Sequence, residues 1–185
     1  MMNKLFKVFI FILLTNQCFA DMDKENTLLL ELSTGMVEIE MYPNKAPDHV
    51  ARIKELARDG FYDGVTFHRV IDGFMAQTGD PTGTGMGGSD KPDLNAEFND
   101  IRHERGVASM ARAQDPNSAN SQFFIMFADA PHLDGQYTAW GKVTKGMENV
   151  DKVKRGDGPG GVVGEPRDSI ISMKVMADVE MKEAQ

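Results

Sequence analysis

The sequence predicts one mainly β domain, an antiparallel barrel or sandwich, and three observations support this fold class. Short apolar runs such as SQFFIMF (121–127) and YTAWGKV (137–143) are separated by stretches rich in Gly, Asp, Asn and Pro, which is typical of antiparallel strands. The 185 residues are 41% hydrophobic, which suits one well-buried core. The alternation of strands and helices that a parallel sheet requires is absent.

The first two strands are expected to form a hairpin. TLLLELS (27–33) is followed almost at once by GMVEIEMY (35–42), and the residues from Ser33 to Gly35 suit a tight turn between them. In the second strand Val37, Ile39 and Met41 alternate with other residues, so they should share the buried face.

Residues 46–60 change to a helical period, and we expect a helix of about three turns there. Pro47 suits its first turn and Gly60 suits its C-terminal cap. The apolar residues that share one face of this helix are Ala46, Val50, Ile53 and Ala57.

The rest of the chain is predicted to be mainly strands. Strand-length apolar runs occupy 65–71, 73–77, 106–111, 121–127 and 137–143. The segment 146–156 (GMENVDKVKRG) favours a second, short helix. A closing strand is expected over 170–181, where the alternating apolar residues are Ile171, Met173, Val175, Ala177 and Val179.

The first twenty residues, MMNKLFKVFIFILLTNQCFA, have the organisation of a secretory signal peptide. Lys4 and Lys7 precede the apolar run 8–14, and Cys18 and Ala20 are small residues at the two positions that matter for cleavage. The run is far shorter than the roughly 20 residues that a membrane span needs, so a cleaved leader is favoured over a permanent anchor. A retained leader would instead tether the domain to a membrane.

Cleavage of this leader removes the cysteine and leaves a strongly acidic chain. Cys18 lies inside the leader, so no disulfide is expected in the mature protein, and the TNQ before it lacks the small residue that usually precedes a lipidated cysteine. The full chain has a formal net charge of −8, which becomes more negative without the two leader lysines. This balance argues against nucleic acid and anionic membranes as partners.

The stretch GTGMGG (83–88) matches the G-x-G-x-x-G spacing of dinucleotide-binding folds. That function requires a helix beginning at the third glycine, whereas SDKPDLNAEF (89–98) contains Pro92 and many turn-forming residues. A phosphate loop would need a lysine after its glycine, and none is present. We interpret the stretch as a glycine-rich surface loop between strands.

The segment upstream of this loop places an arginine among apolar residues. In VTFHRVIDGFMAQ (65–77), strand alternation would put Phe67 and Arg69 on one face and His68 on the other. Arginine cannot act as a base, but it can donate hydrogen bonds into an apolar pocket if a neighbour such as Gln77 holds it. The alternative is a solvated strand residue or a structural ion-pair partner.

Three motifs, in order along the chain, resemble the cyclophilin family of peptidyl-prolyl isomerases. They are FYDGVTFHRVIDGFMAQTGD (61–80), SMARAQDPNSANSQFFI (109–125) and HLDGQYTAWGKV (132–143). The similarity extends over about 27–179, almost the whole mature chain. It implies an eight-stranded antiparallel β-barrel capped by two α-helices, with a peptide groove on its outer face, which agrees with the pattern of strands.

The resemblance also implies which residues act. Arg69, Gln77 and Phe74 would be catalytic, and no metal or other cofactor would take part. Gly85 would border the subsite for the residue that precedes the reacting pair. The residues implied to bind the peptide are Phe74, Met75, Gly85, Ala111, Arg112, Ala113, Gln122, Phe124, Leu133 and Tyr137.

Three positions depart from the family pattern. Arg112 stands where asparagine is frequent, but the resemblance implies that this residue contacts the peptide through its backbone. His132 replaces a tryptophan that contacts the inhibitor cyclosporin in many members, and Tyr137 replaces a histidine at the pocket's edge. These two changes bear on inhibitor binding more than on catalysis. Trp140 is expected in the core.

The implied reaction is rotation about X-Pro bonds during the folding of exported proteins, by non-covalent stabilisation of the transition state with Arg69 in an apolar proline pocket. The expected partners are proline-containing polypeptides and unfolded exported proteins, with no nucleic acid, no stable membrane insertion after cleavage, and a monomeric enzyme. The expected location is the periplasm, with secretion or a leader-tethered form as alternatives. The domain limits are a leader at 1–20, a short segment at 21–26, the isomerase domain at 27–180 and a tail at 181–185.

Other functions fit the sequence less well. The four histidines, His49, His68, His103 and His132, lack close metal-ligand spacing, and no hydrolase elbow surrounds Ser121. The acidic pairs Glu38/Glu40 and Glu97/Asp100 are interpreted as solvated positions rather than as a glycosidase pair. The alternative from another class is a peptide-binding module that has the fold without the catalysis.

Overall fold

The computed structural model describes residues 23–183. The expected leader at 1–20, with Cys18, lies outside the described residues, and so do the last two residues of the expected tail. The cleavage site and the fate of the cysteine therefore stay predictions.

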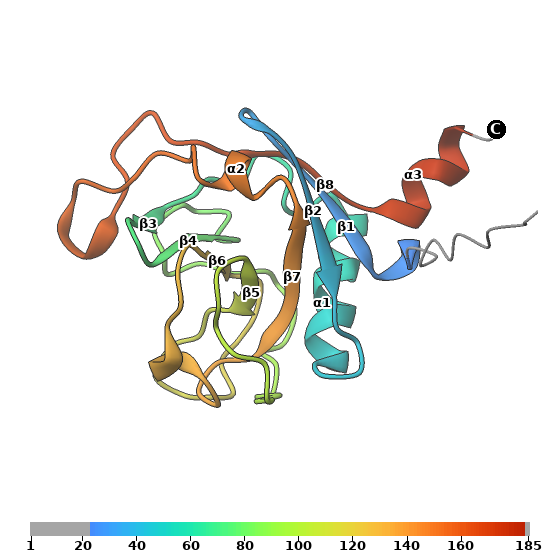
Figure 1. Cartoon of the computed structure of the whole chain (residues 1–185), viewed down its shortest axis with the longest axis horizontal. Coiled ribbons are helices and arrows are strands. Elements are labelled where there is room, and N and C mark those ends of the chain that lie inside the picture. Colours follow the sequence, from blue (N-terminus) through green and yellow to red (C-terminus); the bar gives the residue numbers. More distant parts are fainter. Residues whose placement is uncertain (1–22, 184–185) are drawn as a thin grey trace, which may run out of the picture.

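Eight strands form one antiparallel sheet, which confirms the expected mainly β fold (Figure 1). Their order across the sheet is β3-β4-β6-β5-β7-β2-β1-β8. The strands are β1 (Thr27–Leu32), β2 (Gly35–Met41), β3 (Arg69–Ile71), β4 (Met75–Thr78), β5 (Val107–Met110), β6 (Phe123–Met126), β7 (Ala139–Lys145) and β8 (Ile170–Val175).

The sheet curls so that its two ends meet, and backbone hydrogen bonds join them. Gly64 N–H donates to the Ile170 carbonyl at 2.7 Å, and Phe67 N–H donates to the Asp168 carbonyl at 2.9 Å. The chain leading into β3 is thus tied to the chain leading into β8, although the two strands share no continuous ladder. Closure of this kind pairs backbone groups that an open edge would leave exposed.

The expected hairpin and its buried face are confirmed. β1 and β2 pair from Thr27 opposite Glu40 to Leu32 opposite Gly35, and two residues form the turn. Inside the barrel, Phe123 lies edge to face with Tyr62 at 5.6 Å and with Trp140 at 5.5 Å. All three rings are fully buried, which confirms Trp140 as a core residue. Removing such a side chain from water contributes roughly 1.5–3 kcal/mol.

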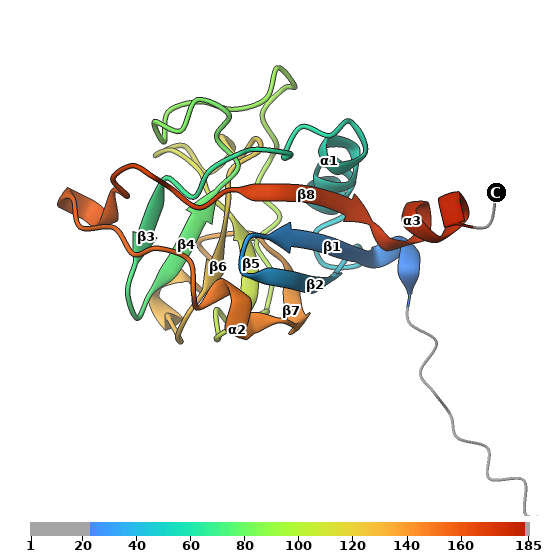
Figure 2. The same ribbon diagram turned by 90° about the horizontal axis from the view of Figure 1, so that it is seen from above.

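The first helix, α1 (Pro47–Arg58), is confirmed as well. Its buried residues include Val50, Ile53 and Ala57, and Gly60 follows it with a φ of 70°, the left-handed conformation that suits a helix cap. Contacts between α1 and β8 place the helix beside this strand (Figure 2), and its buried apolar residues belong to the same hydrophobic core as the strands. The second helix, α2 (Met147–Val150), is shorter than the segment predicted for it.

The closing strand expected over 170–181 is wrong in its second half. β8 ends at Val175, and Met176–Glu183 forms a third helix, α3. The reason is the length of the neighbouring strand, because Val175 pairs with Leu28 near the start of β1 and no partner strand continues beyond it. Arg58 then holds α3 through Asp178 at 2.8 Å. The helix crosses the boundary expected at 180.

The alternation expected in this strand is also interrupted. Ile171 was expected to share the buried face with Met173 and Val175, yet its side chain is 50% exposed while Ile170 is buried. A bulge causes the change, because Ser172 pairs with Glu31 while Ile170 pairs with the next residue of β1.

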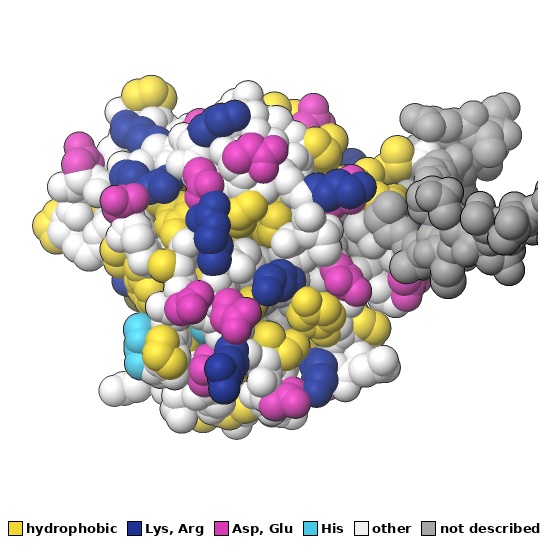
Figure 3. All heavy atoms as spheres, in the orientation of Figure 1, with side chains coloured by type: hydrophobic (Ala, Val, Ile, Leu, Met, Phe, Trp, Pro, Cys, Tyr) yellow, Lys and Arg dark blue, Asp and Glu magenta, His cyan; other side chains and the backbone are white. Residues whose placement is uncertain are grey.

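Among the residues from 23 to 183, no helix is both long enough and apolar enough to cross a membrane. Acidic and basic side chains are interspersed over the face shown in Figure 3.

Candidate functional site

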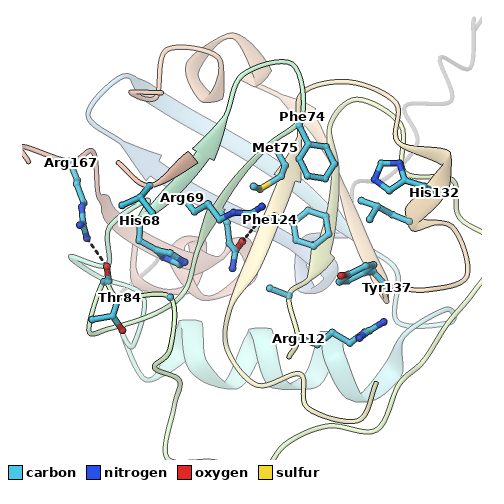
Figure 4. Close-up of a pocket in the computed structure, with 16 residues that line it drawn as sticks. His68, Arg69, Phe74, Met75, Thr84, Arg112, Phe124, His132, Tyr137 and Arg167 are labelled. Atoms are coloured by element: carbon cyan, nitrogen blue, oxygen red, sulfur yellow. Dashed lines mark hydrogen bonds between the residues drawn. The ribbon is translucent and has the colours of Figure 1, made fainter. Parts of the chain in front are cut away.

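A cleft of about 640 Å³ lies on the outer face of the barrel, beside β3, β4 and β6 (Figure 4). A second hollow of about 430 Å³ adjoins it and shares Gln77, Gly85, Ala111 and Arg112 with it. Of the twelve residues expected at the site, ten line the cleft: Arg69, Phe74, Met75, Gln77, Gly85, Ala111, Arg112, Phe124, Leu133 and Tyr137. The other two, Ala113 and Gln122, line the adjoining hollow. The structure therefore brings residues from four separate stretches of sequence to one place.

One side of the cleft is an aromatic wall. Phe124 is only 5% exposed and meets Tyr137 edge to face at 5.8 Å. Phe74 stacks on His132 at 5.8 Å with an angle of 28° between the rings. Leu133, from the short 3-10 helix Pro131–Leu133, completes the apolar surface. Apolar walls of this kind bind an apolar ring and exclude water from it.

A buried polar group supports this wall from behind. His103 stacks on Phe124 at 6.3 Å, and its two ring nitrogens lie 3.0 Å from the Ser109 hydroxyl and 3.0 Å from an Asp134 carboxylate oxygen. Burial lowers the pKa of His103, although the hydrogen bond to Asp134 opposes this shift. The neutral ring, held at both ends, fixes the position of Phe124.

A chain of hydrogen bonds positions Arg69. Strand register places Arg69 opposite Gln77 in the β3–β4 pair, and Arg69 Nη1 donates to Gln77 Oε1 at 3.1 Å. Gln77 Nε2 donates in turn to Gln122 Oε1 at 2.9 Å. Gln122 Nε2 then donates to the carbonyls of Gly85 and Gly87, at 3.1 and 2.8 Å. The orientation of the guanidinium is thus linked to the glycine-rich loop.

Arg69 is also held from its other side. Its Nε donates to the Gly160 carbonyl at 2.9 Å. The segment around Gly160 lies along β3, because Val163 N–H donates to the His68 carbonyl at 3.0 Å and Gly156 N–H donates to the Val70 carbonyl at 2.9 Å. Two acceptors on opposite sides fix the guanidinium plane, and within residues 23–183 Nη2 has no hydrogen-bond partner, so it can donate to a ligand.

The alternation expected around Arg69 is wrong at two positions. Phe67 does not share the outer face with Arg69, since it is fully buried in the barrel core together with Val70. His68 does not point away from the site, since it lies under Gly85 and lines the cleft. The physical reason is that β3 begins only at Arg69, so the strict two-residue period does not apply to the residues before it.

The glycine-rich loop at 82–88 is organised around a buried carboxylate. Asp80 is 1% exposed, and its oxygens accept hydrogen bonds from the backbone N–H groups and hydroxyls of Thr82 and Thr84 and from the N–H groups of Gly85 and Gly87. Burial raises the pKa of Asp80, but these hydrogen bonds outweigh it and lower the pKa to about 2. No helix begins after Gly88, which confirms the expectation that this loop is not followed by the helix that a nucleotide-binding turn requires.

Six further residues line the cleft: His68, Gly83, Thr84, His132, Val162 and Arg167. The sequence showed His132 only as a departure from a family pattern, and it placed His68 on the wrong face. Val162 and Arg167 come from a segment that has no strand or helix pattern. The sequence feature that could have indicated these two residues is the apolar pair between glycines in GGVVGEPR (160–167). No local rule, however, says which side of the barrel such a loop covers.

Two alternative chemistries find no support in the described part of the chain. Among residues 23–183, no group of three or more His, Cys, Asp or Glu side chains is placed to hold a metal ion. Ser121 is fully buried, and its hydroxyl donates to the Gly79 carbonyl at 2.7 Å. A hydroxyl committed in this way lacks the neighbouring base that a nucleophile needs.

Comparisons with known proteins agree on one family. Residues 27–175 match the sequence profile described as cyclophilin type peptidyl-prolyl cis-trans isomerase/CLD. The chain is 52% identical over 170 residues to a probable peptidyl-prolyl cis-trans isomerase from Brucella suis, an alignment covering 85% of this chain and 86% of that one. It is 48% identical over 135 residues to peptidyl-prolyl cis-trans isomerase B from Bacillus subtilis, covering 72% and 93% of the two chains.

Solved structures give the same result. The fold is similar to the cyclophilin AquaCyp293 from Hirschia baltica, with a TM-score of 0.75, 30% identity and coverage of 84% of this chain and 76% of that one. It is also similar to a Cryptosporidium parvum cyclophilin crystallised in the presence of the dipeptide Ala-Pro, with a TM-score of 0.74, 28% identity and coverage of 80% and 98%.

Proposed function

This chain belongs to the cyclophilin-type peptidyl-prolyl cis-trans isomerases, and on that premise we propose that it accelerates X-Pro rotation in exported polypeptides by non-covalent catalysis with Arg69. The observation that carries the proposed mechanism is the hydrogen-bonded placement of the Arg69 guanidinium beside an apolar, aromatic wall. Proline-containing segments are the proposed substrates.

The reaction sets a clear physical requirement. Rotation about an amide bond crosses a barrier of about 18 to 20 kcal/mol, because the C–N bond must lose its partial double-bond character. In the twisted state the nitrogen regains a lone pair, which can accept a hydrogen bond that the planar amide accepts poorly. A donor placed beside that nitrogen therefore binds the transition state more tightly than the ground state.

Arg69 is suited to supply this hydrogen bond. Its Nε and Nη1 are committed to Gly160 and Gln77, which holds the remaining N–H groups in a fixed direction. Preorganised donors cost little reorganisation when charge develops, which is the main advantage of a protein site over water. Gln77 acts on the reaction through Arg69, as a positioning residue.

The aromatic wall would hold the proline ring. Phe74, Met75, Phe124 and Leu133 present apolar surface next to Arg69, and they keep water away from the donated hydrogen bond. Uncatalysed exchange takes tens of seconds, so a rate of about 10³ per second needs the barrier lowered by roughly 7 kcal/mol. One charge-assisted hydrogen bond in a dry site, with restraint of the peptide, is of this size.

The proposed place of action is the periplasm. The support is the leader pattern at 1–20, which would direct the domain out of the cytoplasm to folding proteins. Determining the mass of the protein isolated from its own cells tests this. A chain beginning at Asp21 in the periplasmic fraction is expected, and a full-length chain in the membrane fraction would favour the tethered form instead.

The mechanism is tested with Arg69→Ala. Without the guanidinium, kcat/KM for a proline-containing peptide should fall by more than about tenfold, because a transition-state interaction is lost. The matched control is Arg155→Ala, an arginine outside the cleft that pairs with Asp72. Circular dichroism should show that both variants are folded.

Two outcomes would count against the proposal. An unchanged rate in Arg69→Ala would remove Arg69 from the mechanism. Absence of acceleration by the unmutated protein, with peptide binding retained, would favour a peptide-binding module that has the fold without the catalysis.

A further inference from the structure

The cleft has a charge opposite to that of the whole protein. The chain contains 28 acidic and 20 basic residues, which gives a formal net charge of −8. The residues that line the cleft nevertheless include three arginines, Arg69, Arg112 and Arg167, and no aspartate or glutamate. Such a concentration of one sign in a concave site attracts ligands of the other sign.

The three guanidinium groups are held mainly by carbonyl oxygens. Arg69 donates to a backbone carbonyl and to an amide side chain. Arg112 donates to the carbonyls of Ala113, Gln114 and Gln136 while its guanidinium lies 4.7 Å from the centre of the Tyr137 ring. Carbonyl and amide acceptors fix the direction of a guanidinium without neutralising its charge.

Arg167 is fixed in the same way at the other end of the cleft. Its Nη1 donates to the Gly83 carbonyl at 2.6 Å and its Nε donates to the Val163 carbonyl at 2.7 Å. Glu165 lies 3.3 Å from Nε, but its side chain is 75% exposed, so this pairing is weak. Within the described residues Nη2 of Arg167 has no hydrogen-bond partner, which leaves its N–H groups available to a ligand.

Most arginines outside the cleft have carboxylate partners. Four of them form ion pairs with carboxylates: Arg52 with Glu55, Arg58 with Asp178 and Glu25, Arg105 with Asp151, and Arg155 with Asp72. The fifth, Arg102, is exposed and lies outside the cleft. Four of the five arginines outside the cleft are therefore paired with the protein's own carboxylates, whereas those of the cleft largely are not.

The three charges are spread along the cleft. Figure 4 shows Arg69 between Arg167 on one side and Arg112, beneath Tyr137, on the other. His68 lies near both Arg69 and Arg167. Burial lowers its pKa and the two arginine charges lower it further, although Asp80 opposes them. A neutral His68 leaves the arginines as the charged groups that face a bound segment.

We propose that this cleft selects proline-containing segments that carry aspartate or glutamate next to the X-Pro pair, with Arg167 and Arg112 as the groups that receive those carboxylates. This selectivity rests on the proposed function, since it assigns the kind of substrate that the isomerase site takes. A carboxylate would accept hydrogen bonds from Nη2 of Arg167, whose guanidinium is already oriented by backbone carbonyls, which reduces the entropy lost on binding. Arg112, whose Nε, Nη1 and Nη2 already donate to carbonyls, would contribute mainly its charge.

Charge selection can be tested with peptides, because the charge of the cleft and the net charge of the whole protein predict opposite peptide preferences. We would compare peptides Xaa-Ala-Pro-Phe-Xaa in which Xaa is Glu, Gln or Lys. The net charge of −8 favours the Lys peptide, whereas the cleft favours the Glu peptide. We expect kcat/KM for the Glu peptide to exceed that for the Lys peptide by about fivefold or more.

A matched pair of variants assigns the effect to the cleft. Arg167→Gln and Arg102→Gln each remove one positive charge, but only Arg167 lies in the cleft. We expect Arg167→Gln to lower the ratio of kcat/KM for the Glu peptide to kcat/KM for the Lys peptide by at least about twofold. Arg102→Gln should leave this ratio unchanged. Thermal unfolding of both variants checks that they are folded.

Calorimetric Kd values for the same peptides separate this proposal from the proposed function. If the protein accelerates X-Pro isomerisation in none of the peptides, the proposed catalysis is wrong. The Kd values would still show whether the cleft prefers the Glu peptide to the Lys peptide. Equal kcat/KM and Kd for the Glu and Lys peptides, or a preference for Lys, would overturn the proposal. Equal effects of Arg167→Gln and Arg102→Gln would overturn the role of Arg167.

Discussion

Phe123 and Phe124 are neighbours in β6, yet they belong to two different hydrophobic clusters. Phe123 is fully buried inside the barrel between Tyr62 and Trp140. Phe124 points to the outer face and is 5% exposed, between His103 and Tyr137. The pleat of one strand thus divides two identical side chains between the core and the cleft.

The two clusters have different consequences for the protein. The inner cluster contains most of the buried apolar residues, drawn from all eight strands and from α1. The outer cluster is smaller and includes residues that are only partly buried, such as Phe74, Ala111 and Tyr137. An apolar side chain that keeps some contact with solvent can bind a ligand, so we expect the inner cluster to determine stability and the outer cluster to determine activity.

The largest expected effect is on the stability of the inner cluster. Phe123→Ala should lower the free energy of unfolding by about 3 to 5 kcal/mol, because it removes a buried ring and leaves a closed cavity. Urea unfolding followed by circular dichroism measures this. A loss below about 1 kcal/mol would mean that the barrel interior tolerates the missing ring and that the two clusters do not differ as described.

Phe124→Ala should have a smaller effect on stability and a larger one on activity. The free energy of unfolding should fall by about 1.5 to 3 kcal/mol, since the space left opens into the cleft and water can enter it. The value of kcat/KM should fall at least about tenfold, because the proline pocket loses a wall. If Phe124→Ala destabilised the fold more than Phe123→Ala, the proposed division between the clusters would be wrong.

The loop beside the outer cluster depends on a charge rather than on apolar burial. The pKa of Asp80 is lowered to about 2, so its ionised form stabilises the fold above the unfolded-state pKa of about 4, and this contribution is lost as the pH falls toward 2. Its size is about 2 kcal/mol. In Asp80→Asn that part of the acid destabilisation should be missing from unfolding curves measured between pH 5 and pH 2. An identical pH dependence in both proteins would contradict the role of Asp80.

The smallest expected effect comes from alanine substitution at two glycines that have nearly the same positive φ. Gly85 at the cleft has a φ of +83° and Gly64 outside it has a φ of +84°. Alanine at either position should cost about 1 kcal/mol of stability. A Cβ at Gly85 would meet His68 at 3.4 Å and face the cleft, whereas one at Gly64 meets nothing within 4 Å. Only Gly85→Ala should therefore lower kcat/KM, and equal activities would show that the loop does not approach the peptide.

Several elements could be predicted from the sequence because local patterns encode them. The hairpin of β1 and β2 followed from alternation and a turn signal, and α1 followed from helical spacing with Pro47 and Gly60 at its ends. The end of β8 could not be predicted, since apolar alternation continues past Val175 while the partner strand does not. The bulge at Ile171 likewise depends on pairing with another strand.

The sequence by itself determined the fold class and supplied the residue types of the site, because strand alternation and long motifs are local properties of the chain. Only the tertiary structure decided which segments surround Arg69. Arg167 donates to Gly83, which is 84 positions away in the chain, and Gly160 accepts from Arg69 across 91 positions. Contacts at such separations depend on how the barrel closes, and no local propensity specifies them. The charge of the cleft therefore became visible only in the fold, although every arginine was present in the sequence.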